Sequence, residues 1–169
     1  MEYSGTKDKG NKPIEDSQDG LVVFSPTNGR VVPLNQVEDE VFRKEMVGKG
    51  IGIFPEIPLI FSPVNGIIKY IPETKHAIIV VSDDGIEVLV HIGIDTVELK
   101  GQFFDLMVEV NSKVKVGDPL LRFDKKAISA RGFNLVIPVI ITNANDFSQV
   151  VPIDKERVVV EERLIEVFK

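Results

Sequence analysis

Short apolar stretches separated by turn-forming residues run through the chain from Leu21 onward. Gly, Pro, Asn and Asp lie between the stretches, and none of them continues with long helical periodicity. Strands are therefore predicted at Leu21–Phe24, Ile51–Phe54, Ile67–Ile71, Ala77–Val81, Ile86–Ile92, Leu120–Phe123, Leu135–Ile141 and Arg157–Glu161. Short helical turns are predicted at Glu38–Met46 and Gly101–Val108. This pattern indicates an all-β fold, an antiparallel β-sandwich or flattened barrel with short helical turns.

A Ser-Pro-x-Asn-Gly segment occurs twice, as Ser25–Val31 and again as Ser62–Ile68. Pro sets φ for a turn and Asn-Gly tolerates positive φ, so each copy is predicted to be a tight turn between strands. A weaker similarity links Val47–Ile51 to Val114–Leu120. Together these similarities predict a duplicated β motif. The alternative is that turn chemistry recurs by chance, as it can in any β protein.

The start of the chain differs in composition from the rest. Within residues 1–20, only Met1, Tyr3 and Ile14 have large apolar or aromatic side chains. Such a segment cannot bury enough surface to offset the entropy that ordering costs. Residues 1–20 are therefore predicted to be a disordered N-terminal tail, and residues 21–169 to form one domain.

The composition argues against several functional classes. A net charge of −6 gives no general attraction to nucleic acid. Without cysteine there is no disulfide, thiolate nucleophile or cysteine–metal site. The longest apolar run, Leu135–Ile141, is too short to span a bilayer, and the amino terminus lacks the apolar core of a signal peptide. We expect a soluble, cytoplasmic protein without direct membrane insertion.

The two histidines, His76 and His91, flank a predicted hairpin. A four-residue loop, Ser82–Gly85, would set them opposite each other on one face, with Cβ atoms about 4.5–5.5 Å apart. A two-residue loop would make them diagonal neighbours, whereas a three- or five-residue loop would put them on opposite faces. Thr74 shares the face of His76 if the strand extends back to it, and Leu89 is an apolar neighbour of His91.

Two imidazoles in contact cannot both be protonated cheaply, which favours a neutral, nucleophilic nitrogen near neutral pH. Such a nitrogen can accept a phosphoryl group, ligate a metal or act as a general base. A cross-strand histidine pair without a function is the alternative. The glycines of Gly48–Gly52 match neither a Walker loop nor a dinucleotide fingerprint, and no Gly-x-Ser-x-Gly elbow indicates a hydrolase.

The segment Gly85–Gly101 (GIEVLVHIGIDTVELKG) closely resembles the signature around the phosphorylated histidine of one protein family. This family is the glucose-type enzyme IIA component of the bacterial phosphoenolpyruvate-dependent sugar phosphotransferase system. Glu73–Ala77 (ETKHA) resembles its Glu-Thr-Asn-His-Ala segment, with Lys75 at the Asn position, where a strand would point it away from the site. The resemblance extends over residues 21–168 and implies a flattened barrel or sandwich with a shallow apolar active face.

The resemblance also implies roles for individual residues. His91 would accept phosphate through Nε2 from the histidine-containing phosphocarrier protein and pass it to the IIB domain of a sugar permease. His76 would hydrogen-bond the phosphate, and Thr74 would orient His76. No cofactor is implied. The residues implied in partner binding are Asp39, Val41, Phe42, Leu89, Asp95 and Val97.

Other functions are compatible with the same two histidines. Phosphorylation could act as a switch for regulatory partners, because a phosphate in an apolar patch would repel them. His76 and His91 are too few ligands for zinc, so we expect no metal in the isolated chain, although a partner carboxylate could complete a site. A zinc hydrolase on a similar scaffold would need a His-x-His pair and further ligands that the sequence lacks.

Overall fold

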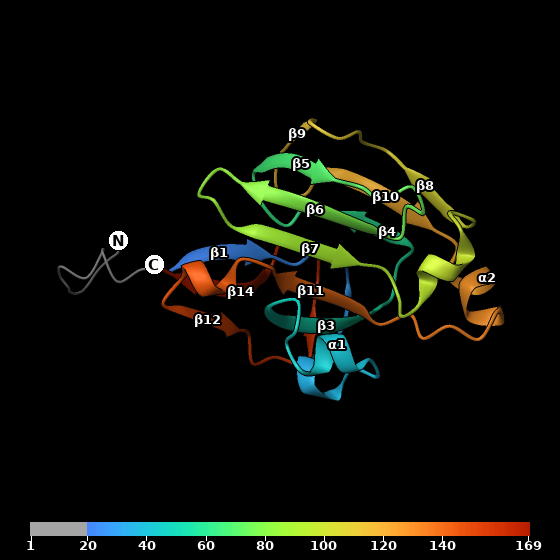
Figure 1. Cartoon of the computed structure of the whole chain (residues 1–169), viewed down its shortest axis with the longest axis horizontal. Coiled ribbons are helices and arrows are strands. Elements are labelled where there is room, and N and C mark those ends of the chain that lie inside the picture. Colours follow the sequence, from blue (N-terminus) through green and yellow to red (C-terminus); the bar gives the residue numbers. More distant parts are fainter. Residues whose placement is uncertain (1–19) are drawn as a thin grey trace.

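The computed structural model describes residues 20–169 and shows fourteen strands with two short α-helices (Figure 1). The helices are α1 (Glu40–Arg43) and α2 (Lys125–Ala130), and single 3-10 turns lie at Leu34–Gln36, Thr96–Leu99 and Ala144–Asp146. The strands are β1 (Leu21–Phe24), β2 (Gly29–Pro33), β3 (Lys49–Pro55), β4 (Leu59–Phe61), β5 (Gly66–Tyr70), β6 (Ala77–Ser82), β7 (Glu87–His91), β8 (Phe104–Leu106), β9 (Lys113–Val114), β10 (Pro119–Phe123), β11 (Ile137–Ile141), β12 (Gln149–Pro152), β13 (Arg157–Val158) and β14 (Arg163–Phe168).

Antiparallel pairing joins these strands into one large sheet and two small ones. The large sheet has the order β13-β2-β3-β11-β7-β6-β5-β9, and the small sheets have the orders β1-β14-β12 and β4-β10-β8. The strand pairings of residues 20–169 close no barrel. The predicted all-β antiparallel class is thus confirmed, and of the two predicted forms the structure has the sandwich.

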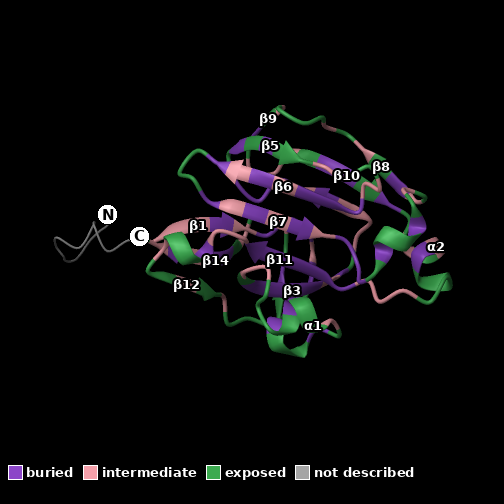
Figure 2. Cartoon of the chain, viewed as in Figure 1, coloured by how far each residue is buried: buried purple, intermediate pink, exposed green. Residues whose placement is uncertain are grey.

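The main core lies between the large sheet and the two small ones. Along β7, Val88 and Val90 are fully buried, whereas Glu87, Leu89 and His91 are half-buried on the other face (Figure 2). This alternation follows from the two-residue period of a strand. The large sheet therefore presents His91 on the face opposite the core.

A second, smaller apolar cluster covers part of that outer face. It holds α1 against β11 and the end of β7, through residues that are almost all buried. Its members are Val32, Leu34, Val37, Phe42, Ile94, Val136 and Ile140, with Val47, Phe54 and Leu89 packed at its edge. Because β11 is covered on both faces, all five of its residues are buried.

The Ser-Pro-x-Asn-Gly repeat is a structural duplication. In both copies the serine Oγ donates to a carbonyl two residues later at 2.7 Å, from Ser25 to Thr27 and from Ser62 to Val64. The large sheet has the same strand relationships on either side of its central β11–β7 pair, with β2 beside β3 and β5 beside β6. The first predicted repeat is confirmed.

The second predicted repeat is wrong. Val114–Leu120 corresponds in its contacts to the segment around Val160, and not to Val47–Ile51. The Val116 amide donates to the Asn65 side chain at 2.9 Å, just as the Val160 amide donates to the equivalent Asn28 at 2.8 Å. The shared Gly-containing pattern near Gly48 reflects turn chemistry alone.

The two predicted helical turns have different outcomes. Glu38–Met46 contains α1, as predicted, and the Asp39 side chain caps its first turn. Gly101–Val108 contains no helix, because Phe104–Leu106 forms β8 and pairs with β10. The predicted tail, residues 1–20, lies outside the described residues except for Gly20. Within residues 20–169, no helix has the length and apolarity needed to cross a membrane.

The duplication gives a prediction about stability. A Cβ at Gly66 would collide with the carbonyl oxygen of Val81 on the next strand, as one at Gly29 would collide with that of Phe54. Gly66→Ala should therefore lower the free energy of unfolding by about 3 kcal/mol, measured by urea denaturation. Gly85→Ala is the control, because its Cβ would meet no atom within 4 Å and costs only about 1 kcal/mol for positive φ. Equal losses for the two variants would contradict this packing.

Candidate active site

The rings of His76 and His91 are in contact at one end of β6 and β7. Their centroids are 4.8 Å apart and their planes cross at 83°. His91 is the last residue of β7, and His76 lies at the bend just before β6. His76 is 9% exposed and His91 is half-buried. The sequence prediction that the two imidazoles meet is therefore matched by the structure.

The hairpin that brings them together differs from the predicted one. Its register places Ala77 opposite His91, and the Ser82 amide donates to the Ile86 carbonyl at 2.8 Å, so the loop has three residues. In a regular hairpin such a loop separates the two imidazoles onto opposite faces. They meet because His76 precedes β6 at a bend, where strand alternation does not apply.

A tight turn before β6 directs His76 toward His91. The Lys75 amide donates to the Pro72 carbonyl at 2.9 Å, and Lys75 has φ of 59°. Lys75 therefore lies in a turn, whereas the sequence pattern predicted that it lies on a strand. The Asn of the family pattern suits this position better, because Asn tolerates the left-handed region. The Thr74 Oγ1 lies 2.7 Å from Nδ1 of His76, which fixes the ring from behind.

A backbone carbonyl determines which nitrogen of His91 carries the proton. Nδ1 of His91 lies 2.7 Å from the carbonyl oxygen of Gly93. A carbonyl can only accept, so Nδ1 must be the protonated nitrogen and Nε2 of the neutral ring keeps its lone pair. Sequence analysis did not assign this role to Gly93. Its positive φ of 79° turns the carbonyl, and the only sequence signal was a glycine inside the motif.

Both histidines favour the neutral form. Burial, and to a smaller extent the neighbouring charge of His91, lowers the pKa of His76 to about 4. Burial also lowers the pKa of His91. The Gly93 carbonyl and the carboxylates of Asp39 and Asp95 oppose this second shift, because each favours the protonated ring. The pair is therefore uncharged at pH 7, with a free nucleophilic nitrogen on His91.

Helix α1 places an aromatic ring on His91. The Phe42 ring is 5.0 Å from the His91 ring, edge to face, and is buried in the smaller cluster. The Asp39 carboxylate accepts from the amides of Val41 at 2.9 Å and Phe42 at 3.2 Å, which starts the helix in the right place. Asp39 thus acts as a helix cap in addition to lowering the cost of charge on His91.

The other predicted site residues lie around the histidines. Leu89 precedes His91 on the same face of β7 and packs at the edge of the smaller cluster. Val41 on α1 and Val97 on the 3-10 turn after β7 are 41% and 49% exposed. Asp95 is also exposed and begins that turn. The site is thus a pair of imidazoles within a partly apolar, partly acidic surface.

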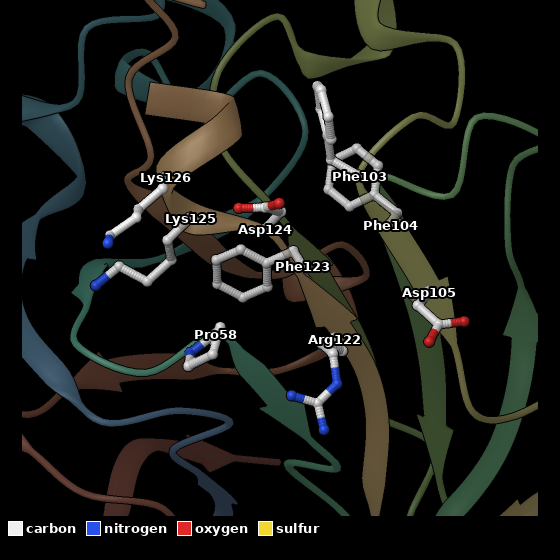
Figure 3. Close-up of a pocket in the computed structure, with 9 residues that line it drawn as sticks. All are labelled: Pro58, Phe103, Phe104, Asp105, Arg122, Phe123, Asp124, Lys125 and Lys126. Carbon is white, nitrogen blue, oxygen red and sulfur yellow. The ribbon is translucent and has the colours of Figure 1, made fainter. Parts of the chain in front are cut away.

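This surface is separate from a hollow of about 760 Å³ near α2. That hollow lies between the end of β10, the start of α2 and Phe103, and includes neither histidine (Figure 3). Lys125, which lines it, already donates to the Pro55 carbonyl at 2.8 Å. Among residues 20–169, no group of three or more His, Cys, Asp or Glu is arranged to hold a metal ion.

Comparisons with known proteins agree with this geometry. A family model described as phosphoenolpyruvate-dependent sugar phosphotransferase system, EIIA 1, matches residues 21–147. The beta-glucoside-specific EIIBCA component of Bacillus subtilis is 45% identical over 127 residues, which cover 75% of this chain and 21% of that protein. The glucose-specific EIICBA component of Staphylococcus saprophyticus is 42% identical over 146 residues, covering 86% of this chain and 21% of that protein. The chain thus spans about a fifth of the length of these relatives.

A solved structure is also similar. The glucose permease IIA from Mycoplasma capricolum aligns with a TM-score of 0.77 and 32% sequence identity, covering 89% of this chain and 96% of that one. The fold, the histidine pair and the sequence matches are consistent with one another. The chain therefore belongs to the EIIA 1 family of the phosphoenolpyruvate-dependent sugar phosphotransferase system.

Proposed function

We propose that this chain is a cytoplasmic phosphocarrier whose His91 accepts a phosphoryl group from the histidine-containing phosphocarrier protein. The group then passes to the IIB domain of a sugar permease. The observation that carries this proposal is the hydrogen bond from Nδ1 of His91 to the Gly93 carbonyl, which leaves Nε2 as the nucleophile. In the first step the Nε2–phosphorus bond forms while the donor's nitrogen–phosphorus bond breaks.

His76 stabilises the phosphoryl group as it leaves His91 for the next acceptor. When the Thr74 hydroxyl donates to Nδ1 of His76, the neutral ring carries its proton on Nε2 and can donate it to a phosphoryl oxygen. Because its pKa is about 4, His76 does this as a neutral donor. Phosphoryl transfer depends mainly on alignment and charge stabilisation. Thr74 aligns the His76 ring, and the ring stabilises the charge on the phosphoryl group.

The surface around His91 suits brief docking of other proteins. Val41, Val97 and Leu89 offer a modest apolar area, and the carboxylates of Asp39 and Asp95 lie beside it. A small apolar area supports transient association and excludes water from the transferring group. The same surface is where we expect regulatory partners, and a partner's carboxylate could join the two histidines in binding zinc.

The acceptor assignment can be tested directly by isotope transfer. When the chain is incubated with the phosphocarrier system and labelled phosphoenolpyruvate, the wild type should take up one acid-labile phosphate, and His91→Gln should take up none. Glu87→Gln serves as a matched control, since it changes the same face of β7 at its other end and leaves both rings and the docking surface. Label retained by His91→Gln would disprove the assignment.

The role of His76 predicts unequal effects on the two transfer steps. His76→Gln should accept phosphate within about threefold of the wild-type rate, since Nε2 of His91 is intact. Onward transfer to a IIB domain should fall by about a hundredfold, the usual cost of losing one correctly placed transition-state donor, because Thr74 does not hold the Gln amide as it holds the His76 ring. Rapid-quench kinetics would measure both steps.

Thr74→Val tests the orientation of His76 separately. It removes the hydroxyl and keeps the shape, so onward transfer should slow by about tenfold and acceptance should change little. Normal onward transfer in both variants would remove His76 and Thr74 from the mechanism.

The lowered pKa values predict how the site responds to pH. A histidine whose pKa is lowered in the folded state stays neutral as the pH falls through 6.5. His76 should therefore titrate near pH 4, and His91 below pH 6.5. NMR titration of the two rings measures this, with an unfolded peptide as reference. The unfolded chain binds these protons at a higher pH than the folded chain does. The free energy of unfolding should therefore also fall as the pH drops from 6.5 to 4, and it should fall by less in His76→Gln. Titration of either ring above pH 6.5 would contradict the prediction.

A further inference from the structure

The hydrogen-bonded ladder between β7 and β11 continues beyond both strands to Gly93, whose carbonyl orients His91. The Gly93 amide donates to the Val136 carbonyl at 3.0 Å. In an antiparallel ladder the two residues of such a pair exchange both hydrogen bonds, so the Val136 amide would donate back to Gly93. It does not: the Gly93 carbonyl faces the imidazole of His91 instead.

The side chain of Asn134 accepts the hydrogen bond from the Val136 amide instead. Its Oδ1 accepts from that amide at 2.9 Å, across only two residues, in the manner of an Asx turn. The backbone carbonyl of Asn134 accepts from Ile94 at 2.9 Å, and its Nδ2 donates to Glu38 at 3.2 Å. Asn134 therefore links the segment before β11 to both the loop after His91 and the segment before α1.

We propose that Asn134 is a positioning residue for His91, an inference that rests on the proposed function. By holding the Val136 amide, Asn134 leaves the Gly93 carbonyl available to Nδ1 of His91. This keeps the proton on Nδ1 and the lone pair on Nε2, where phosphate is accepted. Asn134 touches neither imidazole, so its effect acts entirely through the Gly93 carbonyl.

The burial of Val136 makes this competition strong. Val136 is 1% exposed, so an amide that loses Asn134 has no water to bond and must find another acceptor. The nearest acceptor by ladder register is the Gly93 carbonyl. Sharing that carbonyl weakens the bond from His91, and the ring then populates the tautomer with its proton on Nε2. That tautomer has no lone pair for phosphorus.

The test reads the His91 tautomer by imidazole nitrogen NMR on the full chain, at a pH where the ring is neutral. Wild type should show the Nδ1-protonated form. Asn134→Ala should shift the tautomer ratio toward the Nε2-protonated form by about five- to tenfold, the factor expected for losing one hydrogen bond. Asn134→Asp keeps the oxygen acceptor and should retain the wild-type ratio. If the alanine variant folds poorly, Asn134→Gln takes its place in the experiment. Gln moves the acceptor out of reach with little loss of polarity, so it should give the same shift in tautomer ratio.

Asn143→Ala is the matched control. Asn143 also binds a backbone amide through its Oδ1, that of Glu87 at 3.0 Å, but at the opposite end of β7. It should lower the urea midpoint without changing the His91 tautomer. The inference is overturned if Asn134→Ala and Asn134→Gln keep the wild-type ratio, or if Asn143→Ala changes it as much. Because this readout involves no phosphate, it is independent of whether His91 is phosphorylated, which the isotope experiment decides.

Discussion

The site depends on the contact between two uncharged imidazole rings. Burial lowers the pKa of His91 by more than its acidic neighbours raise it. His76 and His91 lie 4.8 Å apart, and their lowered pKa values keep the pair uncharged at neutral pH. A protonated pair would repel itself and would have no nucleophile. Each ring is also fixed from behind through its Nδ1, by the Gly93 carbonyl and by Thr74. Both Nε2 atoms are therefore available to a phosphoryl group, one as acceptor and the other as donor.

The duplicated fold explains why this site is on one half only. By register, Ile140 occupies in β11 the place that His91 occupies in β7, since β3 pairs with β11 as β6 pairs with β7. Ile140 is fully buried in the smaller cluster under α1, whereas His91 is half-buried at its edge. One half thus supplies the apolar support for α1 and Phe42, and the other supplies the reactive pair. The site lies at the end of β7, one of the two central strands of the large sheet.

Local patterns predicted the strands and the histidine pair, but not the geometry that joins the rings. Alternation and turn residues are local, so strands such as β7 and the repeated turns at Ser25 and Ser62 could be predicted. The hairpin register could not, because the bend at His76 overrides strand alternation and depends on the turn at Lys75. Asn134 gave no signal, since its effect on His91 passes through a contact between segments far apart in sequence. The β8 strand was mistaken for a helix because its two inward residues are too few to show a period.

The central claim is that phosphate is carried on Nε2 of His91. Nitrogen–phosphorus coupling in a chain with labelled imidazole rings, phosphorylated through its donor proteins, tests it most directly. The account predicts one phosphorus coupled to Nε2 of His91, with Nδ1 of that ring still protonated. Coupling to Nδ1 of His91, or to either nitrogen of His76, would contradict it.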